Sequence, residues 1–328
     1  MLLASKNVED QLKMEHNKRV LVTGADGMVG SALIRLLNGR HLSILAPTHR
    51  ELDLCDRPQV EDYFAEYHPQ YVFMIAAKVG GIAANKDDPV GFLSDNVRMQ
   101  FNLFEACHKF GTVRNLFLGS SCIYPRECPQ PMKEDYLLTG PLEPTNEGYA
   151  LAKIVGLKLA SYYYSQHGML TICPMPCNIY GTNDHFDLQR SHVLSALVRR
   201  FVDAQDEGTP FVTLWGTGSA RREFIHVEDV AQALIFLMES YQSTELINVG
   251  TGTDISIHDL GILIAEQVGY SGDVCWDQSK PDGMPRKCLD ISRLTTLGFR
   301  ALVTLEQGIR QTITEYRQLK AEGMVDEH

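Results

Sequence analysis

The sequence lacks the features that mark membrane, secreted and nucleic-acid-binding proteins. No apolar run approaches the length of a membrane-spanning helix, and residues 1–18 are polar and mixed in charge, without the apolar core of a secretory signal. The formal net charge of −11 argues against nucleic acid and anionic membrane surfaces as partners, although a local basic pocket still suits an anionic ligand. We therefore expect a globular chain with a mobile tail at residues 1–18, no nucleic-acid partner and no membrane contact.

The sequence also offers no disulfide or metal framework. Its eight cysteines are scattered without regular spacing, which in a chain without a signal predicts reduced thiols and a cytoplasmic location. Cys173 and Cys177 flank Pro-Met-Pro, but no Cys/His cluster completes a zinc site, so no metal is expected. Internal repeats and low-complexity linkers are lacking too, and 328 residues suit one large or two intimate domains.

A strand, a glycine-rich turn and a helix follow the expected tail. Arg19–Thr23 is a short apolar run, residues 24–30 read Gly-Ala-Asp-Gly-Met-Val-Gly, and an apolar-periodic helix is expected over 31–37. Gly24 permits the tight turn, Gly27 lets the backbone approach a pyrophosphate, and Gly30 lets the helix pack on the strand. The helix N-terminus then faces the phosphates. This arrangement predicts a dinucleotide site, and a tight turn without a ligand is the alternative.

Apolar runs and amphipathic segments alternate along the first half of the chain. Strands are expected over 42–46, 71–77, 116–119 and 171–173, and helices over 58–67, 90–110 and 145–165. This alternation predicts a doubly wound parallel α/β sheet that binds ligands at the carboxyl ends of its strands.

The alternation weakens beyond residue 181. Helices are expected near 193–204 and 257–268, with strands near 211–214 and 247–249. We predict a mainly NADP-binding Rossmann domain over 19–181, interlocked with a smaller α/β domain over 182–328 that mainly binds substrate. Some segments of the second domain are expected to return to the Rossmann sheet.

The residues after the second strand bear on the choice of dinucleotide. A site for NAD places Asp or Glu at this strand end, where the carboxylate binds a ribose hydroxyl. Here Pro47 and Thr48 precede His49 and Arg50, which supply cations and no carboxylate. This composition favours the extra phosphate of NADP, and a solvated loop is the alternative.

Tyr149 and Lys153 carry the clearest catalytic signal. They lie four residues apart in the helix over 145–165, which Thr145 or Asn146 can cap, and the spacing places both on one face. A free phenol titrates at about 10, and an adjacent ammonium favours the phenolate. This predicts a lowered pKa for Tyr149 and a proton donor usable near neutral pH. A surface pair without a chemical role has the same spacing.

Nearly the whole chain, over 19 to about 316, resembles the extended short-chain dehydrogenase/reductase family. Gly24–Gly30, Ser120, and Tyr149 with Lys153 match that family's nucleotide loop and catalytic triad in order and spacing. The resemblance implies NADPH-dependent 3,5-epimerisation and 4-reduction of GDP-4-keto-6-deoxy-D-mannose to GDP-L-fucose. The runs most similar to the branch with this activity are 76–82, 119–125, 142–147, 191–193 and 280–283.

The resemblance implies a role for each catalytic residue. A ketone at C4 makes the protons at C3 and C5 acidic, and Cys122 and His192 are implied as the base and acid on opposite faces of the sugar. A free thiol titrates at about 8.5 and a free imidazole at about 6.5, both within reach of neutrality. Ser120 would hydrogen-bond the keto oxygen, and Tyr149 would protonate it as hydride arrives. Lys153 would lower the pKa of Tyr149 and hold the nicotinamide ribose.

Without the resemblance, Cys122 reads as core packing and His192 as a surface or capping residue. An arginine fork at Arg222 suits the diphosphate of the substrate, although Arg221-Arg222 alone reads as a solvated pair. The expected substrate contacts are Cys122, Asn178, Arg200, Trp215, Arg222 and Asp282. The expected cofactor contacts are Gly24, Gly27, Met28, Val29, Gly30, His49, Arg50, Asp53, Leu54, Ala76, Ala77, Leu118, Gly119, Ser120, Ser121, Tyr149, Lys153, Pro176, Cys177, Asn178, Ile179 and His192.

Three positions depart from the family pattern. Asp26 stands where a basic residue near the NADP phosphate is frequent, so its charge opposes a preference for NADPH. Cys177 replaces a threonine at a strand end near the sugar, where it bears on the length or stereochemistry of the substrate. Gly148 replaces a proline before Tyr149, which frees the unfolded backbone without abolishing the chemistry.

The resemblance also implies a homodimer, in which the helices over 90–110 and 147–165 pair across the interface as a four-helix bundle. Core packing would produce the same apolar pattern. Two rival functions stay open: the same chemistry on another GDP-4-keto sugar, such as a 6-deoxy-heptose or a colitose precursor, and a non-catalytic NADP-binding regulator. Intact Ser120, Tyr149 and Lys153 oppose the regulator.

Overall fold

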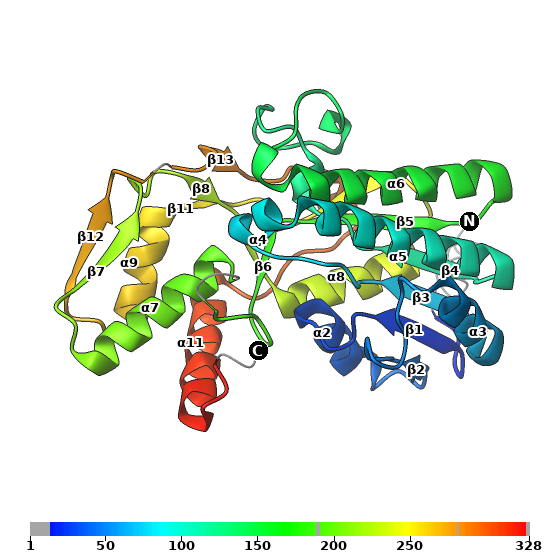
Figure 1. Cartoon of the computed structure of the whole chain (residues 1–328), viewed down its shortest axis with the longest axis horizontal. Helices are drawn as coiled ribbons and strands as arrows, with labels where there is room; N and C mark the ends of the chain where they lie inside the picture. Colours follow the sequence, from blue (N-terminus) through cyan, green and yellow to red (C-terminus); the bar gives the residue numbers. More distant parts are fainter. Residues whose placement is uncertain (1–13, 188–190, 281, 326–328) are drawn as a thin grey trace, which may run out of the picture.

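The computed structural model describes residues 14–187, 191–280 and 282–325 (Figure 1). Most of the expected N-terminal tail, residues 1–13, lies outside this part of the chain. Met14 is buried in the larger hydrophobic core. Glu15 donates its backbone N–H to the Tyr71 hydroxyl, so the end of the expected tail is attached to the central sheet.

A six-stranded parallel sheet forms the centre of the larger part of the molecule. The strands run in the order β10-β5-β4-β3-β1-β2, and each pair of neighbours is parallel. Most are nearly continuous apolar runs, typical of strands covered on both faces. The predicted doubly wound α/β fold is confirmed. The six strands are β1 (Arg19–Thr23), β2 (Ser43–Leu45), β3 (Tyr71–Met74), β4 (Arg114–Phe117), β5 (Thr171–Pro176) and β10 (Leu246–Val249).

Helices cover both faces of this sheet. On one face, α3 (Arg57–Tyr67) packs on α5 (Pro89–Phe110), and α5 lies alongside α6 (Glu147–His167) over most of its length (Figure 1). On the other face, α2 (Met28–Leu37) packs on α8 (Val227–Ser240). Asp88 caps α5 by accepting the Gly91 N–H, and Pro89 occupies the first helical position, a combination that favours helix initiation.

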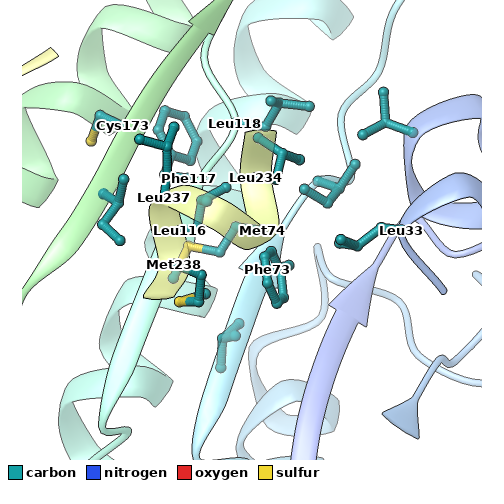
Figure 2. Close-up of a cluster of buried hydrophobic side chains, with 14 of the residues drawn as sticks. Leu33, Phe73, Met74, Leu116, Phe117, Leu118, Cys173, Leu234, Leu237 and Met238 are labelled. Carbon is teal, nitrogen blue, oxygen red and sulfur yellow. The ribbon is translucent and has the colours of Figure 1, made fainter. Parts of the chain in front are cut away.

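Side chains of α8 fill the space between that helix and the sheet (Figure 2). Leu234 and Leu237 lie over Phe73 of β3 and Leu116 of β4, which are register partners in the sheet. The next strand residue, Phe117, points to the opposite face, where its ring leaves no room for a side chain at Gly156 of α6. The sheet is therefore packed tightly against helices on both sides, which fixes α6 relative to the end of β4.

The smaller part of the molecule is built around a second core. There α7 (Val193–Glu207), α9 (Ile257–Val268) and α11 (Leu305–Glu322) pack together, and β7 (Phe211–Trp215) pairs in parallel with β12 (Asp273–Asp277) (Figure 1). Two small sheets lie beside them: β11-β8-β13, and β6 with β9. Their strands are β6 (Asn178–Tyr180), β8 (Arg221–Arg222), β9 (Phe224–His226), β11 (Ile255–Ser256) and β13 (Arg286–Lys287).

The structure corrects several predicted boundaries. The helix α2 begins at Met28, before the predicted start at 31, because Gly27 with extended backbone is its N-cap. β3 ends at Met74, short of 77, while β5 runs on to Pro176. Sequence analysis did not predict α8, α11, or the shorter elements α4 (Ile82–Asp87), α10 (Ser292–Thr296), η1 (Ser121–Ile123), η2 (Glu134–Tyr136) and η3 (Pro144–Asn146).

Candidate active site

Four neighbouring strands end at one edge of the sheet, and the predicted site residues follow them. The order β5-β4-β3-β1 brings the segments after residues 176, 117, 74 and 23 side by side. Thr23 links two of these ends, because its hydroxyl accepts the backbone N–H groups of Ile75 and Ala76. The carboxyl edge of a parallel sheet is where ligands bind in such folds.

The glycine-rich turn leaves room for a diphosphate at the start of α2. Gly24 has a φ of +70°, which glycine adopts readily, and a Cβ there would lie 2.9 Å from the Ala76 Cα. A Cβ on Gly30 would lie 2.0 Å from the Gly24 carbonyl oxygen. The first turn of α2 has no side-chain cap and no acidic residue. Its N–H groups, at Met28, Val29 and Gly30, therefore suit an anion, and the residues present fit a dinucleotide.

The predicted contacts for the outer part of the dinucleotide lie after β2. His49 and Arg50 are exposed there, while Leu54 is buried. Asp53 accepts the Cys55 N–H through its carboxylate. Asp26 is also exposed, and its backbone carbonyl accepts the side-chain amide of Asn183, from a segment following β6.

The face of α6 contacts the loop after β4 at every second residue of that loop. The Lys153 Nζ donates to the Leu118 carbonyl oxygen at 2.7 Å. Tyr149 lies close enough to the Ser120 side chain for Ser120 to lower the pKa of its phenol. Asn146 donates its side-chain amide to the Cys122 sulfur at 3.2 Å. Residues 146, 149 and 153 are spaced i, i+3 and i+7, so they lie on one helix face.

Burial dominates the electrostatics of Tyr149 and Lys153. Burial alone lowers the pKa of Lys153 to about 7, and the side chain is only 2% exposed. Burial, and next the negative charge that Cys122 can carry, raise the pKa of Tyr149 above its ordinary value, whereas the hydrogen bond with Ser120 lowers it. The predicted lowering of the Tyr149 pKa by Lys153 is therefore wrong for this state. A lysine that itself loses its proton readily provides little positive charge.

Cys122 is held from two sides. The Ser120 hydroxyl accepts the Cys122 backbone N–H at 3.2 Å and caps the short helix η1. Asn146 contacts the sulfur. Asn146 was predicted only as a helix cap, but its side chain makes no capping hydrogen bond. Its position three residues before Tyr149 is the signal that would have placed it beside Tyr149 and Lys153.

His192 lies at the entrance to α7, in a different part of the molecule. It is exposed, occupies the N-cap position and makes no side-chain cap hydrogen bond. The end of α7 that carries it points toward the centre of the molecule (Figure 1). His192 is near enough to buried Asp184 to lower the pKa of that carboxyl, although burial raises it more. In the described part of the chain, no hydrogen bond joins His192 to Cys122.

Three of the predicted substrate contacts lie together in the smaller part of the molecule. The Asp282 carboxylate accepts the Thr217 N–H at 2.9 Å and its hydroxyl at 2.7 Å, which ties Asp282 to the turn after Trp215. A Cβ on Gly283, the next residue, would lie 2.9 Å from a terminal nitrogen of Arg222. Trp215 is 66% exposed and so offers a free ring face.

Arg200 and Arg222 differ in their surroundings. Arg222 donates to the carbonyl oxygens of Arg221 and Met284, and burial lowers its pKa. It also lines an open cavity of about 640 Å³ whose other walls come from residues 250–255 and 291–306. Arg200 on α7 donates to the Thr213 carbonyl oxygen of β7 at 3.3 Å. The lining of this cavity does not include Ser120 or Tyr149.

Cys177 and Asn178 lie next to Glu223, a buried residue that was not among the predicted site residues. Cys177 is only 7% exposed, and burial, followed by the charge of Glu223, raises its pKa. Glu223 is fully buried and accepts three backbone N–H groups, from Thr251, Gly252 and Leu289, each at 2.7 Å. The Asn178 amide donates to the Glu223 carbonyl oxygen. The thiol at 177 thus packs inside this network, and in the described part of the chain no hydrogen bond joins it to Ser120.

Other chemical features of the chain are limited. All eight cysteines are unpaired. Within 14–187, 191–280 and 282–325, no group of three His, Cys, Asp or Glu residues is arranged to hold a metal ion. The helices over the same residues include none long and apolar enough to cross a membrane.

Comparison with known proteins places this arrangement in a family context. A family model described as the NAD dependent epimerase/dehydratase family matches residues 20–250. The chain is 48% identical over 300 residues to the probable GDP-L-fucose synthase 1 of Oryza sativa subsp. japonica, covering 91% of this chain and 92% of that protein. The likeness therefore extends over both parts of the molecule.

Two solved structures have a similar fold over nearly their full length. A GDP-6-OMe-4-keto-L-xylo-heptose reductase from C. jejuni has a TM-score of 0.87 at 30% identity, covering 93% of this chain and 99% of that one. A GDP-L-fucose synthetase from Naegleria fowleri bound to NADP has a TM-score of 0.86 at 27% identity, covering 94% and 97%.

Proposed function

The chain belongs to the NAD dependent epimerase/dehydratase family, and we propose that it converts GDP-4-keto-6-deoxy-D-mannose to GDP-L-fucose with NADPH. It is a sugar-nucleotide epimerase and reductase. The observation that carries this proposal is the register between α6 and the loop after β4. There Lys153, Tyr149 and Asn146 contact Leu118, Ser120 and Cys122 in turn. The 48% identity to a probable GDP-L-fucose synthase over most of the chain supports the choice of substrate.

Reduction at C4 uses Ser120 and Tyr149. Bound NADPH supplies the hydride that C4 receives. Ser120 is close enough to Tyr149 to lower the pKa of its phenol, so the two hydroxyl groups can both donate to one keto oxygen. A Tyr149 whose pKa is raised by burial keeps its proton until the oxygen gains negative charge, as a general acid must. Lys153 donates a hydrogen bond to the Leu118 carbonyl oxygen, which holds the lysine side chain in place within the site.

Epimerisation at C3 and C5 uses Cys122 and His192. At each carbon, one group removes the proton from the C–H bond, whose electron pair passes into an enolate. The other group delivers a proton to the opposite face of the same carbon. Cys122 is close enough to Tyr149 that a negative charge on its sulfur raises the pKa of the Tyr149 phenol. His192 is the N-cap residue of α7, in a different part of the molecule from Cys122, which supports a position on the opposite face of the sugar.

The GDP part is bound by the smaller part of the molecule, in this proposal by Trp215, Arg222 and Asp282, with Arg200 nearby. Trp215 offers an exposed ring for the base, and Arg222 offers terminal guanidinium N–H groups for the diphosphate. Residues 19–181 mainly bind the cofactor and residues 182–328 mainly bind the sugar nucleotide. Asn178, at the junction, is a contact to both.

NADPH is held along the carboxyl edge of the sheet. The turn over 24–30 receives the diphosphate, His49 and Arg50 receive the extra phosphate, and Ala76 and Ala77 border the adenosine half. Leu118–Ser121 and Pro176–Ile179 border the nicotinamide half. A solved relative bound to NADP supports this cofactor. The exposed carboxylate of Asp26 opposes it only weakly, because solvent screens an exposed charge.

We also propose a cytoplasmic homodimer. Eight unpaired cysteines suit a reducing compartment. Both α5 and α6 carry apolar side chains on their outward faces, including Val90, Phe101, Leu151 and Tyr162. A second copy of the chain would cover them by forming a four-helix bundle.

A second candidate is the same chemistry on a GDP-4-keto-heptose. The similarity to a heptose reductase from C. jejuni favours it, and the same residues would act. Cys177, the departure from the family pattern near the sugar, is buried against Glu223. It would therefore change substrate choice through the position of the loop over 250–252 more than by direct contact.

The decisive experiment uses purified protein, GDP-4-keto-6-deoxy-D-mannose and NADPH in deuterated water. NADPH oxidation is followed by absorbance and the product by NMR. Deuterium at C3 and C5 with GDP-L-fucose formed supports the proposal. Consumption of NADPH without deuterium leaves a simple reductase and removes the role of Cys122 and His192. No reaction with this sugar, but turnover of a GDP-4-keto-heptose, establishes the second candidate.

A further inference from the structure

We propose that Asn146 is a positioning residue that holds the Cys122 sulfur as a hydrogen-bond acceptor. In this position the sulfur is directed toward the sugar. The geometry comes from the chain alone, whereas the link to sugar chemistry rests on the proposed function.

The first observation is the orientation of the Asn146 side chain. Asn146 is the N-cap residue of α6, a position where asparagine normally accepts a backbone N–H of the first turn. Here its backbone has φ −140° and ψ 24°, and its side chain makes no capping bond. The Nδ2 atom instead donates to the Cys122 sulfur at 3.2 Å. The Asn146 side chain thus makes this contact in place of the stabilising cap that asparagine usually provides.

The second observation is that the segment before α6 is anchored so as to fix Asn146. The Asn146 N–H donates to the Glu143 carbonyl oxygen at 3.2 Å. The Glu143 carboxylate accepts both the N–H and the hydroxyl of Thr145, at 3.2 and 3.0 Å, and lies 3.6 Å from Arg126. The 3-10 turn η3 therefore presents the amide of Asn146 in one orientation.

The third observation is that the amide oxygen of Asn146 has no hydrogen-bond partner. This oxygen, Oδ1, is buried, and no donor among the described residues reaches it. The hydrogen bond to Cys122 is therefore the one side-chain hydrogen bond that Asn146 makes in the described part of the chain. A network that fixed this amide for purely structural reasons would satisfy the oxygen as well.

The chemical effect follows from the direction of the hydrogen bond. An amide N–H that donates to sulfur stabilises the thiolate more than the thiol, so it favours the form that removes a proton from carbon. When the sulfur is protonated, its S–H must point away from Asn146. Together with the bond from the Cys122 backbone to Ser120, this leaves the sulfur's free side for the substrate.

The test measures thiol reactivity in the full-length protein without substrate or cofactor. The rate at which iodoacetamide alkylates Cys122 is measured at pH 7.5 by peptide-resolved mass spectrometry, with exposed Cys275 as the internal reference. In Asn146→Ala the rate at Cys122 should fall about tenfold, because a hydrogen bond that stabilises the thiolate is lost. The rate at Cys275 should not change.

Two further variants separate positioning from a purely structural role. Aspartate caps helices as well as asparagine does, so a capping role predicts that Asn146→Asp behaves like the native protein. Our proposal predicts a larger fall in the alkylation rate of Cys122 than in Asn146→Ala, because a carboxylate replaces the donor. Lys158→Ala, which changes an exposed side chain of α6 outside this network, should leave the rate unchanged. Native alkylation rates in both Asn146 variants would overturn the proposal.

A second readout connects the contact to the chemistry. Exchange of deuterium into C3 and C5 of GDP-4-keto-6-deoxy-D-mannose, measured without NADPH, should slow about tenfold in Asn146→Ala and stay unchanged in Lys158→Ala. Normal exchange despite a slower alkylation of Cys122 would remove the catalytic part of the proposal. If the native protein exchanges no deuterium, the proposed function fails, while the alkylation rate still decides whether Asn146 holds the sulfur.

Discussion

At the scale of single residues, burial controls the protonation of the helix face that carries the site. Lys153 is 2% exposed and makes its hydrogen bond to a neutral carbonyl. It therefore lacks the negative partner that normally keeps a buried ammonium charged. Tyr149, one turn away, has its pKa raised for the same reason. Both effects oppose the charged form, so the unliganded site favours neutral side chains.

Burial of Lys153 predicts a pH-dependent stability. Burial lowers its pKa to about 7, and a free lysine titrates at about 10.4. Between these values the unfolded chain binds more protons than the folded one, so the free energy of unfolding rises with pH. From pH 7.5 to 9.5, urea unfolding should show native stability rising by about 2 kcal/mol more than that of Lys153→Met. Lys158→Met, on the exposed face of α6, should keep the native slope. Equal slopes for Lys153→Met and the native chain would contradict this account.

Arg50, the exposed cation after β2, predicts a measurable preference for NADPH over NADH. Arg50 is exposed, and residues 46–50, directly after β2, include no carboxylate. Loss of a charge-assisted hydrogen bond to phosphate typically changes binding by about tenfold or more. In Arg50→Ala, the ratio of kcat/KM for NADPH over NADH should fall about tenfold, measured by absorbance at saturating sugar nucleotide. The control is Arg310→Ala, an exposed arginine on α11. A ratio unchanged by Arg50→Ala would return His49 and Arg50 to the role of solvated loop residues.

At the scale of elements, the first strand, the glycine turn and the long helices were predictable because their signals are local. Apolar periodicity and glycine spacing act over a few residues, and α5, α6 and α9 lie where the pattern predicts. The contacts that complete the site are not local. Asn146 reaches Cys122, which is 24 positions away, and Glu223 reaches Leu289, which is 66 positions away. No periodicity in the sequence encodes such pairs.

Glu223 illustrates how one buried side chain fixes several elements. Its carboxylate joins the loop after β10 to Leu289, two residues after β13, while its backbone carbonyl oxygen accepts the side-chain amide of Asn178, the first residue of β6. Sequence analysis read the preceding Arg221-Arg222 as a possible solvated pair and gave Glu223 no role. In the structure Arg222 is half-buried near Asp282, and the alternation along the strand turns Glu223 into the interior.

Replacing this carboxylate should be costly. In Glu223→Gln, an amide nitrogen replaces one acceptor oxygen and faces backbone donors, so at least one buried N–H loses its partner. We expect destabilisation by about 3 kcal/mol, measured by urea unfolding with tryptophan fluorescence. Trp215 and Trp276, the two tryptophans of the chain, lie on the paired strands β7 and β12 and report on this part of the molecule. Glu266→Gln, exposed on α9, is the control. A change below about 0.5 kcal/mol would show that the network does not depend on the charge.

At the scale of the whole molecule, α5 and α6 present an apolar outer face on which a second copy of the chain could dock, and α6 also carries the site contacts on its inner face. Val90, Leu93 and Phe101 are exposed at i, i+3 and i+11 on α5, and Leu151 and Tyr162 are exposed at i and i+11 on α6. These spacings place each set along one stripe of its helix. The inward face of α6 carries the contacts to Leu118, Ser120 and Cys122. An assembly on the outer stripe would therefore hold in place the helix that carries Tyr149 and Lys153.

The apolar stripe predicts a homodimer that dissociates when carboxylates are introduced into its interface. Sedimentation equilibrium at micromolar concentration should give twice the chain mass for the native protein. Phe101→Asp combined with Leu151→Asp should give the monomer, because burying two carboxylates in an apolar interface is strongly unfavourable. Phe211→Asp, which places the same charge on an exposed aromatic position of β7, should remain dimeric.

Because dimerisation stabilises the folded state by mass action, the native Tm should rise with protein concentration and the Tm of the double variant should not. A native protein that sediments as a monomer at all concentrations, or a folded double variant that stays dimeric, would exclude this face as the interface.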